Sequence, residues 1–411
     1  MTDTHTFDTP VGARRSVCCA ARLLSAGVAL VFALLAPAQA MAQAEPQLIG
    51  LLPSLIGGDA ANDFNSAMVS QLSTYPGGSS AGGFTFTFNP TNQTFARNSD
   101  SFGPSFAERA MTMGQDTFNV GVTFQRATYD TFEGLNLSNG DVRFRAEGQP
   151  NPGDVVDARL AIDLSTDMMV FFMSYGLTDR LDVGTMVPII RVGFDASITP
   201  TLVQTAAGPL PMGQRVSLPV QARSDTASGV GDVSVRTKYN FVKRPGGGAS
   251  VMVDVRMPTG DAEEMLGTGA GAAKVMFVAS STLGRVAPHF NAGYTFVGAR
   301  ANNTIAIDDE WNYVAGVDTV VTNDVSASFD IVARTITNIG RLRLGPAPNQ
   351  TGDPANQLNR EAGNLNLRMA GVGLKWRVVG TWLVSGSVLM PLTDAGLVDH
   401  ATWSLGLDWT K

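Results

Sequence analysis

Near-strict alternation of apolar and polar residues runs through about twelve segments of the chain between Gln115 and Trp409. The last segment is the clearest, because apolar side chains recur at every second position from Ala401 to Trp409. Successive side chains of a β-strand point to opposite faces, so each segment has one apolar and one polar face. An apolar outer face and a polar, charged inner face are typical of a barrel with lipid outside and water inside.

The connections between these segments alternate in length. Five are short turns that contain Gly, Pro, Asn or Asp, and the six between them are longer loops, notably 129–156, 197–228 and 339–363. This alternation is typical of an up-and-down antiparallel transmembrane β-barrel with short periplasmic turns and long external loops, and an even strand number places both barrel ends on the periplasmic side. The predicted strands are 117–128, 157–175, 181–196, 229–243, 248–258, 272–282, 286–298, 309–319, 325–338, 364–378, 381–392 and 400–409.

The first forty-odd residues predict an export signal. Three arginines precede an apolar stretch over 23–36, and triplets of small residues that suit cleavage end at Ala40 and Ala44. About fourteen apolar residues are too few to span a hydrocarbon core of roughly 30 Å, which argues against a retained anchor. We therefore expect residues 1–44 to be a signal peptide, cleaved between about Ala40 and Ala44, and the mature chain to reach the bacterial outer membrane.

Composition excludes several classes of function. Both cysteines, Cys18 and Cys19, lie in the predicted signal, so the mature chain has no disulfide, thiol nucleophile or Cys-ligated metal. The net charge of −7 argues against a nucleic-acid partner. After the signal there is no run of 18 or more apolar residues, so helical membrane spans are not expected.

Residues 45–114 differ from the rest of the chain. Gly, Pro, Ser, Asn and Thr clusters surround one short aromatic alternation at 84–88. Three interpretations stay open: a plug inside the barrel, a periplasmic extension, or a partly ordered leader. The sequence thus predicts three parts, with 45–114 as an N-terminal leader or plug segment between the signal and a barrel over 115–411.

A barrel in lipid also predicts aromatic residues at the two membrane interfaces. All five tryptophans lie near strand ends, whereas the core tryptophans of a soluble β-sandwich, the alternative fold, should favour mid-strand positions. The residues predicted for these girdles are Tyr175, Tyr239, Phe241, Trp376, Trp382 and Trp409 beside the short turns or the C-terminus, and Phe296, Trp311, Tyr313 and Trp403 beside the long loops.

Charged residues fix which face points inward, since an Arg or Lys facing lipid at the midplane costs roughly 2–4 kcal/mol. Twelve strands tilted by about 40° leave a lumen of about 10 Å between side chains. Its mixed charges form either a transverse field that orders a solute at a constriction or an ion-pair network that fills the lumen. The predicted lumen-lining residues are Asp232, Arg236, Lys238, Asp254, Arg256, His289, Asn291, Asp318, Asp330, Arg334, Arg368, Lys375, Arg377 and Asp408.

One predicted strand is irregular. Within 364–378 the apolar residues change from odd to even positions, which predicts a β-bulge near 370–371. The faces of the segment after Met168 in 157–175 cannot be assigned, because it is apolar on both.

Catalytic and metal-binding motifs have little support. A barrel enzyme of the phospholipase type needs a His-x-Ser pair, and neither His289 nor His400 has a serine two positions on. The Gly-Val-Gly run at 229–231 lacks the following helix of a phosphate loop. The acidic loop 261–264 is better explained as solvated than as a divalent-cation site. We expect no enzyme activity, no cofactor and no metal.

Three phrases at strand–turn junctions carry a family resemblance. They are Ser-Tyr-Gly-Leu-Thr-Asp-Arg-Leu-Asp-Val-Gly at 174–184, Gly-Val-Gly-Asp-Val at 229–233 leading to Lys-Tyr-Asn-Phe at 238–241, and Met-Pro-Thr-Gly-Asp at 257–261. In this order they resemble outer-membrane transporters grouped under the name "meta-pathway of phenol degradation". The resemblance covers roughly 115–411 and implies uptake of aromatic or other hydrophobic small molecules.

The expected function is a monomeric outer-membrane channel for passive uptake of small molecules, and the alternative is a structural or adhesion barrel without transport. The alternation up to Trp409 resembles the closing strand that the barrel-assembly machinery recognises. Expected partners are therefore this machinery, outer-membrane lipid and lipopolysaccharide, and a small-molecule solute.

Overall fold

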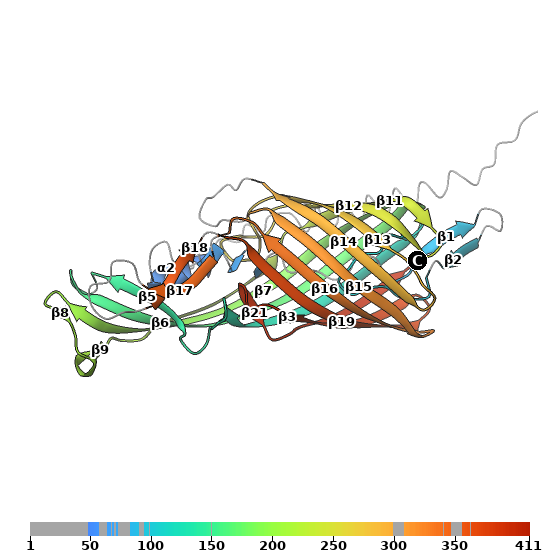
Figure 1. Cartoon of the computed structure of the whole chain (residues 1–411). Helices are drawn as coiled ribbons and strands as arrows, with labels where there is room; N and C mark the ends of the chain where they lie inside the picture. The colour runs from blue at the N-terminus through green and yellow to red at the C-terminus, as the bar shows by residue number, and fades with distance from the viewer. Residues whose placement is uncertain are drawn as a thin grey trace, which may run out of the picture. The chain divides into compact units, whose positions relative to one another are not determined.

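Twelve long strands form a closed antiparallel barrel, because the last strand is hydrogen-bonded to the first (Figure 1). The computed structural model describes residues 48–411 except 57–63, 67, 70, 73–82, 90–93, 98, 149, 299–307, 340, 347–355 and 362, so the predicted signal peptide lies outside the described residues. The predicted twelve-stranded barrel is confirmed. Its strands, in order around the ring, are β3 (Phe118–Phe132), β6 (Val155–Thr178), β7 (Leu181–Thr205), β11 (Ser234–Arg244), β12 (Gly247–Arg256), β13 (Ala272–Ser280), β14 (Val286–Val297), β15 (Glu310–Thr322), β16 (Val325–Ile336), β19 (Leu365–Val379), β20 (Trp382–Pro391) and β22 (Thr402–Thr410).

The longest strands extend past the ring on the side of the long loops. β6 and β7 contain 24 and 25 residues and pair along almost their whole length. The sequence predicted loops over 129–156 and 197–228. The strands that flank the outer parts of β6 and β7 are mostly short and lack the long alternation that marks the barrel wall. These outer strands are β4 (Leu135–Asn136), β5 (Val142–Glu147), β8 (Gly208–Pro209), β9 (Val216–Ser217), β10 (Gln221–Val230) and β21 (Leu397–Asp399).

Strand β7 pairs with two strands in succession. Its outer part pairs with β10 and its inner part with β11, and residues 231–233 between them leave the strand conformation. The predicted strand 229–243 is therefore broken near its start. Pro188 of β7 faces the break and cannot donate a ladder hydrogen bond, while its carbonyl accepts one from Gly231 N.

The remaining elements are short. Two separate hairpins pair β1 (Phe86–Asn89) with β2 (Thr94–Arg97) and β17 (Arg341–Pro346) with β18 (Asn356–Glu361). Helical elements are α2 (Leu48–Ile56) and the 3-10 turn η1 (Met212–Gln214). Among the described residues, no helix is both long and apolar enough to cross a membrane.

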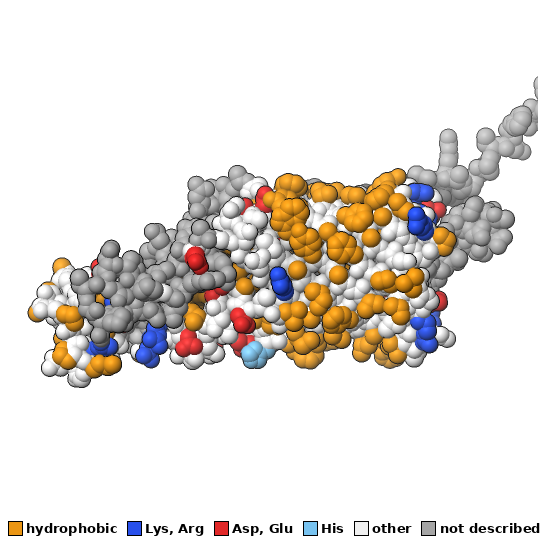
Figure 2. Space-filling view, in the orientation of Figure 1, with side chains coloured by type: hydrophobic (Ala, Val, Ile, Leu, Met, Phe, Trp, Pro, Cys, Tyr) orange, Lys and Arg blue, Asp and Glu red, His pale blue; other side chains and the backbone are white. Residues whose placement is uncertain are grey.

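The outward face of the barrel is apolar. Figure 2 shows apolar side chains gathered over the barrel strands on the face in view. Leu405 and Leu374 are 65% and 55% exposed, whereas inward neighbours such as Ser404 and Lys375 are buried. The burial pattern thus places the apolar face outward, as lipid requires.

The ten predicted girdle aromatics all lie on outward faces near strand ends. The Trp382 and Trp409 rings lie 6.1 Å apart beside the short turns, and the Trp311 and Tyr313 rings stack at 6.3 Å near the long loops. Tyr294, which the sequence analysis did not include, packs edge-on against Trp311 at 4.6 Å. Their role at the membrane interfaces stays a prediction.

The predicted β-bulge near 370–371 is wrong. The register between β16 and β19 runs without a break from Val325 opposite Trp376 to Ile336 opposite Leu365. The apolar parity changes because Leu365 and Leu367 point inward, where they pack with Ile336. An apolar patch inside the lumen therefore produced the signal that we interpreted as a bulge.

Arg368 must be corrected for the same reason. Without a bulge, even positions of β19 point outward along its whole length, and Arg368 is exposed there instead of lining the lumen. It lies near the long-loop end of the strand, where an outward arginine costs little compared with the midplane.

Candidate functional site

A non-regular stretch of chain lies inside the barrel. Residues 99–114, here called the lumen segment, come directly before β3 and are all buried except Asp100. Buried backbone outside regular structure needs hydrogen-bond partners, and inward side chains of the wall supply them. Six backbone N–H groups are satisfied in this way: Phe102 N by Ser326 Oγ (3.0 Å), Ser105 N and Phe106 N by Asp330 Oδ2 (3.2 and 3.1 Å), Glu108 N by Asn291 Oδ1 (2.8 Å), Ala110 N by Ser280 Oγ (3.0 Å) and Met113 N by Asp182 Oδ2 (3.0 Å).

The carbonyl groups of the lumen segment are bound as well. Asn291 Nδ2 donates to Glu108 O at 3.0 Å, so this one amide side chain binds both backbone groups of Glu108. The Ala110 carbonyl accepts from Asn240 Nδ2 at 2.6 Å and from Ser250 Oγ. Side chains of the wall thus bind the backbone groups of the lumen segment, which in a β-strand would be bound by the backbone of a neighbouring strand.

The lumen segment also places two charges among those of the wall. Glu108 Oε1 lies 2.7 Å from Arg236 Nη1, and Glu108 Oε2 lies 4.0 Å from Lys238 Nζ. Arg109 Nη2 donates to Ser101 O at 2.8 Å and lies 3.3 Å from Asp318 Oδ2. Buried charges are tolerated when they are paired in this way.

His289 connects the two carboxylates at the centre of this network. Its Nε2 atom lies 2.7 Å from Asp330 Oδ1, and its Nδ1 atom lies 3.5 Å from Asp318 Oδ1. Asp330 binds the backbone of the lumen segment and Asp318 binds Arg109, so the imidazole holds both attachment points in place.

Two wall glycines leave room for the lumen segment. A Cβ atom at Gly373 would overlap Ser105 Oγ, and one at Gly371 would overlap the Phe106 ring. Ser105 Oγ instead approaches Ser328 Oγ to 2.8 Å. This fit was not predictable from the alternation pattern, because an inward-facing glycine has no side chain to mark it.

We expect Gly373→Val to displace the lumen segment, since the new side chain occupies the position of Ser105. The readout is tryptic cleavage after Arg109, which is 3% exposed; we expect it to rise at least tenfold in folded, detergent-purified protein. The control is Gly386→Val on the outward face, where the nearest atom is 3.7 Å from the added Cβ. Equal cleavage in both variants would contradict the packing described here.

A cavity of about 220 Å³ lies in the lumen beside the lumen segment. Phe106 and Glu108 form part of its boundary. Its remaining lining has two sides, an apolar side from β6 and β7 and a charged side from β11, β12, β13, β15, β16 and the break just before β11. The apolar side comprises Met168, Val170, Met186, Pro188 and Ile190, and the charged side Asp232, Arg236, Asp254, Arg256, Lys274, Glu310 and Arg334.

Two of the cations on the charged side form short ion pairs. Arg236 Nη2 lies 2.6 Å from Asp254 Oδ2, and Arg334 Nη2 lies 2.5 Å from Glu310 Oε2. Arg256 is more loosely placed, with its Nε atom 3.8 Å from Asp232 Oδ2.

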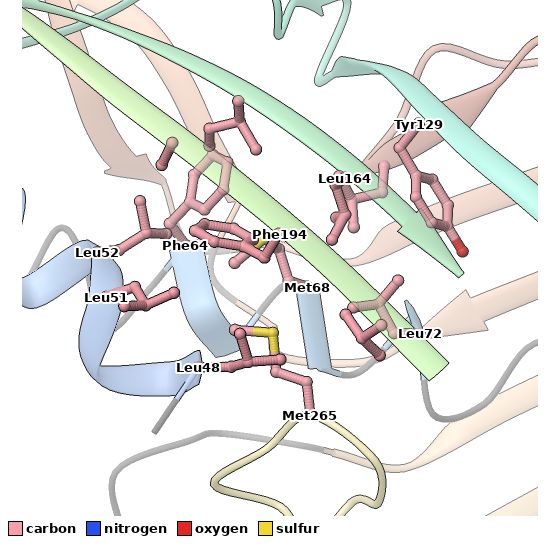
Figure 3. Close-up of a cluster of buried hydrophobic side chains, with 14 of the residues drawn as sticks. Leu48, Leu51, Leu52, Phe64, Met68, Leu72, Tyr129, Leu164, Phe194 and Met265 are labelled. Atoms are coloured by element: carbon pink, nitrogen blue, oxygen red, sulfur yellow. The ribbon is translucent and has the colours of Figure 1, made fainter. Parts of the chain in front are cut away.

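The far side of the cavity borders an apolar cluster at the long-loop end of the barrel. This outer cluster joins α2 and helical residues between 64 and 72 to β6, β7 and the loop before β13 (Figure 3). Ile190 belongs both to the outer cluster and to the lining of the cavity. The cluster residues labelled in Figure 3 are Leu48, Leu51, Leu52, Phe64, Met68, Leu72, Tyr129, Leu164, Phe194 and Met265.

Polar contacts fix the edges of the outer cluster. Gln71 Oε1 accepts from Leu397 N at 2.8 Å, and Asn65 Nδ2 donates to Ile49 O at 2.7 Å. Glu264 Oε2 accepts from Leu48 N at 3.4 Å, and partial burial raises the pKa of this carboxyl group above its ordinary value. The acidic loop that the sequence analysis considered as a cation site therefore contacts α2; among the described residues, no group of three or more His, Cys, Asp and Glu could hold a metal ion.

The predicted lumen residues, Arg368 apart, lie on inward positions and fall into three places. Asp232, Arg236, Asp254, Arg256 and Arg334 line the cavity. Lys238, His289, Asn291, Asp318 and Asp330 surround the lumen segment, and Lys375 Nζ donates to Phe102 O at 3.4 Å. Asp408 is buried opposite Leu383 near the short turns, and Arg377 pairs at the rim with Asp324 at 2.5 Å.

Five charged residues of this site are not among those predicted from the sequence. Lys274, Glu310 and Asp182 lie on inward parity, which could have identified them. Glu108 and Arg109 lie in a stretch without periodicity, so no sequence signal placed them in the lumen.

An apolar outward face, aromatic strand ends and a charged lumen define a transmembrane β-barrel of the outer-membrane type. Residues 144–337 match the family model described as "Putative MetA-pathway of phenol degradation", which confirms the family that the strand–turn phrases indicated.

Several solved structures are similar to the chain at low identity. An outer membrane channel from Pseudomonas putida F1 shares 13% identity at a TM-score of 0.46, covering 74% of this chain and 98% of that one. A Pseudomonas aeruginosa FadL homologue shares 11% at 0.32, covering 72% and 89%, and a mutant of the TodX monoaromatic hydrocarbon channel shares 9% at 0.31, covering 72% and 90%. A search of curated proteins found no match.

Proposed function

We propose that this protein is an outer-membrane channel for the passive uptake of small molecules, and that its N-terminal part closes the lumen. The observation that carries the proposal is the cavity of about 220 Å³, which lies inside a twelve-stranded wall between the lumen segment and the outer cluster. The lumen segment and the helical part of the outer cluster come from residues before β3, and the wall strands surround the space between them.

The cavity limits the size of the solute. An apolar cavity of about 150 Å³ in another protein accommodates benzene, so the volume here suits a molecule with a single ring. The apolar side fits such a ring, and the family to which residues 144–337 match is named for phenol degradation. Aromatic or similarly small, partly apolar compounds are therefore the proposed cargo.

The other expectations are part of the same proposal. Residues 1–44 are the cleaved signal peptide, 45–114 the closing segment and 115–411 the barrel. The chain is a monomer without catalytic activity, inserted by the barrel-assembly machinery beside lipopolysaccharide. A purely structural or adhesion barrel would not need the two-sided cavity, and for this reason we place the channel first.

Liposome swelling tests the proposal. Vesicles that contain the purified protein should swell only slowly in glycerol, because the lumen segment closes the lumen most of the time, and fail to swell in a trisaccharide, because the lumen is narrow. A parallel sample of Asp330→Ala, which releases the lumen segment, should swell faster. No swelling in glycerol by either protein would contradict a channel and favour the structural alternative.

A further inference from the structure

Two cations of the lumen cavity lack a close carboxylate partner. Lys274 Nζ has no ion pair within 4.0 Å among the described residues, and Arg256 Nε is buried without a hydrogen-bond partner there. By contrast, Arg236 and Arg334 form ion pairs of 2.6 and 2.5 Å. The spare hydrogen-bond donors of the cavity are therefore on Lys274 and Arg256.

The nearest acids are already occupied. Asp254 lies opposite Lys274 in the sheet register, but Asp254 Oδ2 accepts from Arg236 Nε at 2.8 Å and Nη2 at 2.6 Å. Asp232 accepts from Gly260 N at 3.1 Å, Thr268 N at 2.9 Å and Thr268 Oγ1 at 2.7 Å. In the observed arrangement the two spare cations make one ion pair among the described residues, the 3.8 Å approach of Arg256 Nε to Asp232 Oδ2.

The two spare cations are neighbours on one face. In the register of β12 and β13, Lys274 lies opposite Asp254 and Arg256 lies opposite Ala272. Lys274 and Arg256 are therefore diagonal neighbours across these two strands. Inward diagonal side chains of adjacent strands are roughly 7–8 Å apart at the backbone, within joint reach of one small group for long side chains. A carboxylate between them would accept from the guanidinium and the ammonium together.

The rest of the cavity determines the body of the ligand. Met168, Val170, Met186 and Ile190 present an apolar side without a charged group, and methionine adapts its shape to different ligands. A free inorganic anion would leave this side unused, and an uncharged ring would leave the two cations unpaired. An amine would be repelled by both.

We propose that the lumen cavity binds a small monocarboxylate with an apolar, ring-sized body, its acid group on Lys274 and Arg256 and its body on the methionine-rich side. The inference rests on the proposed channel function, for which it names the substrate class. It makes the cavity a selective site on the path and not merely a gap in an ion-pair network.

Equilibrium dialysis with radiolabelled benzoate tests the inference. We expect saturable binding to purified wild-type protein or to Asp330→Ala, whose opened lumen gives access, and at least tenfold weaker competition by benzyl alcohol and benzylamine. Lys274→Gln and Arg256→Gln should each weaken benzoate binding at least tenfold. Lys243→Gln is the matched control, because Lys243 lies near the short turns, 3.9 Å from Asp179, and should bind as the wild type does.

Folding is checked by the heat-dependent gel mobility of each variant, and Lys274→Arg, which keeps the charge, should retain binding within about threefold of wild type. Absence of saturable benzoate binding in both wild type and Asp330→Ala, or unchanged binding by Lys274→Gln, would overturn the inference. Glycerol swelling of vesicles from the same preparations separates the two proposals. Swelling without benzoate binding overturns only the carboxylate site, whereas benzoate binding without swelling supports the site and contradicts the channel.

Discussion

Asp330→Ala is expected to convert the closed barrel into an open one. Asp330 Oδ2 accepts the backbone N–H groups of Ser105 and Phe106, and no other wall side chain among the described residues accepts two backbone N–H groups of the lumen segment. Leaving a buried donor unpaired costs roughly 1–3 kcal/mol, so the loss of both contacts is enough to release the centre of the segment. Single-channel recording in planar bilayers should show conductance steps several times larger than those of the wild type.

A disulfide lock provides the control. Ser105 Oγ and Ser328 Oγ are 2.8 Å apart, and the only cysteines, Cys18 and Cys19, lie in the predicted signal. Adding Ser105→Cys and Ser328→Cys to Asp330→Ala should keep the channel closed when oxidised and open it on addition of reductant. If Asp330→Ala conducts as the wild type does, and the oxidised lock changes nothing, the lumen segment is not the closure.

Leu405→Arg is expected to prevent normal membrane assembly. Leu405 lies mid-way along β22, points outward and is 65% exposed in the isolated protein. An arginine facing lipid at the midplane costs roughly 2–4 kcal/mol, a large part of the stability of a small barrel. The folded fraction recovered from outer membranes, measured by heat-dependent gel mobility, should fall severalfold.

The comparison for this prediction uses a residue away from the wall. Met212 lies in η1 and is 81% exposed, so Met212→Arg should assemble like the wild type. Leu405→Met, which stays apolar, should do the same. Wild-type recovery of Leu405→Arg would place this face of β22 out of contact with lipid.

The barrel was predictable from the sequence because the two-residue alternation of apolar and polar side chains and the alternation of short turns with long loops both indicate the same fold. In the part of the wall that has lipid on one side and a charged lumen on the other, as from Ser234 to Asn240, parity assigned each face correctly. The same rule failed at Leu365 and Leu367, since the lumen is itself apolar there and the pattern carries no information on which apolar face meets lipid. Arg368 was misplaced as a direct consequence.

The site was less predictable than the wall. Lys274 lies in a strand of mostly small and apolar residues, where a single charged residue does not show clearly which face is polar. It nevertheless lies opposite Asp254 in the sheet register, so both side chains are on the inward face. The lumen segment could not be placed at all, because its conformation is determined by contacts with residues about 70 to 230 positions away, such as Asp182 and Asp330. Long-range partners of this kind leave no local period.

The lumen segment is covalently joined to the wall it closes, since β3 begins only a few residues after Met113. Its binding is therefore intramolecular, with an effective concentration of order millimolar for a short flexible tether. Once released, the segment can rebind at a rate that does not depend on protein concentration. Each barrel contains one lumen segment, so the ratio of closing segment to channel is always one to one. Closure of one channel is consequently independent of its neighbours.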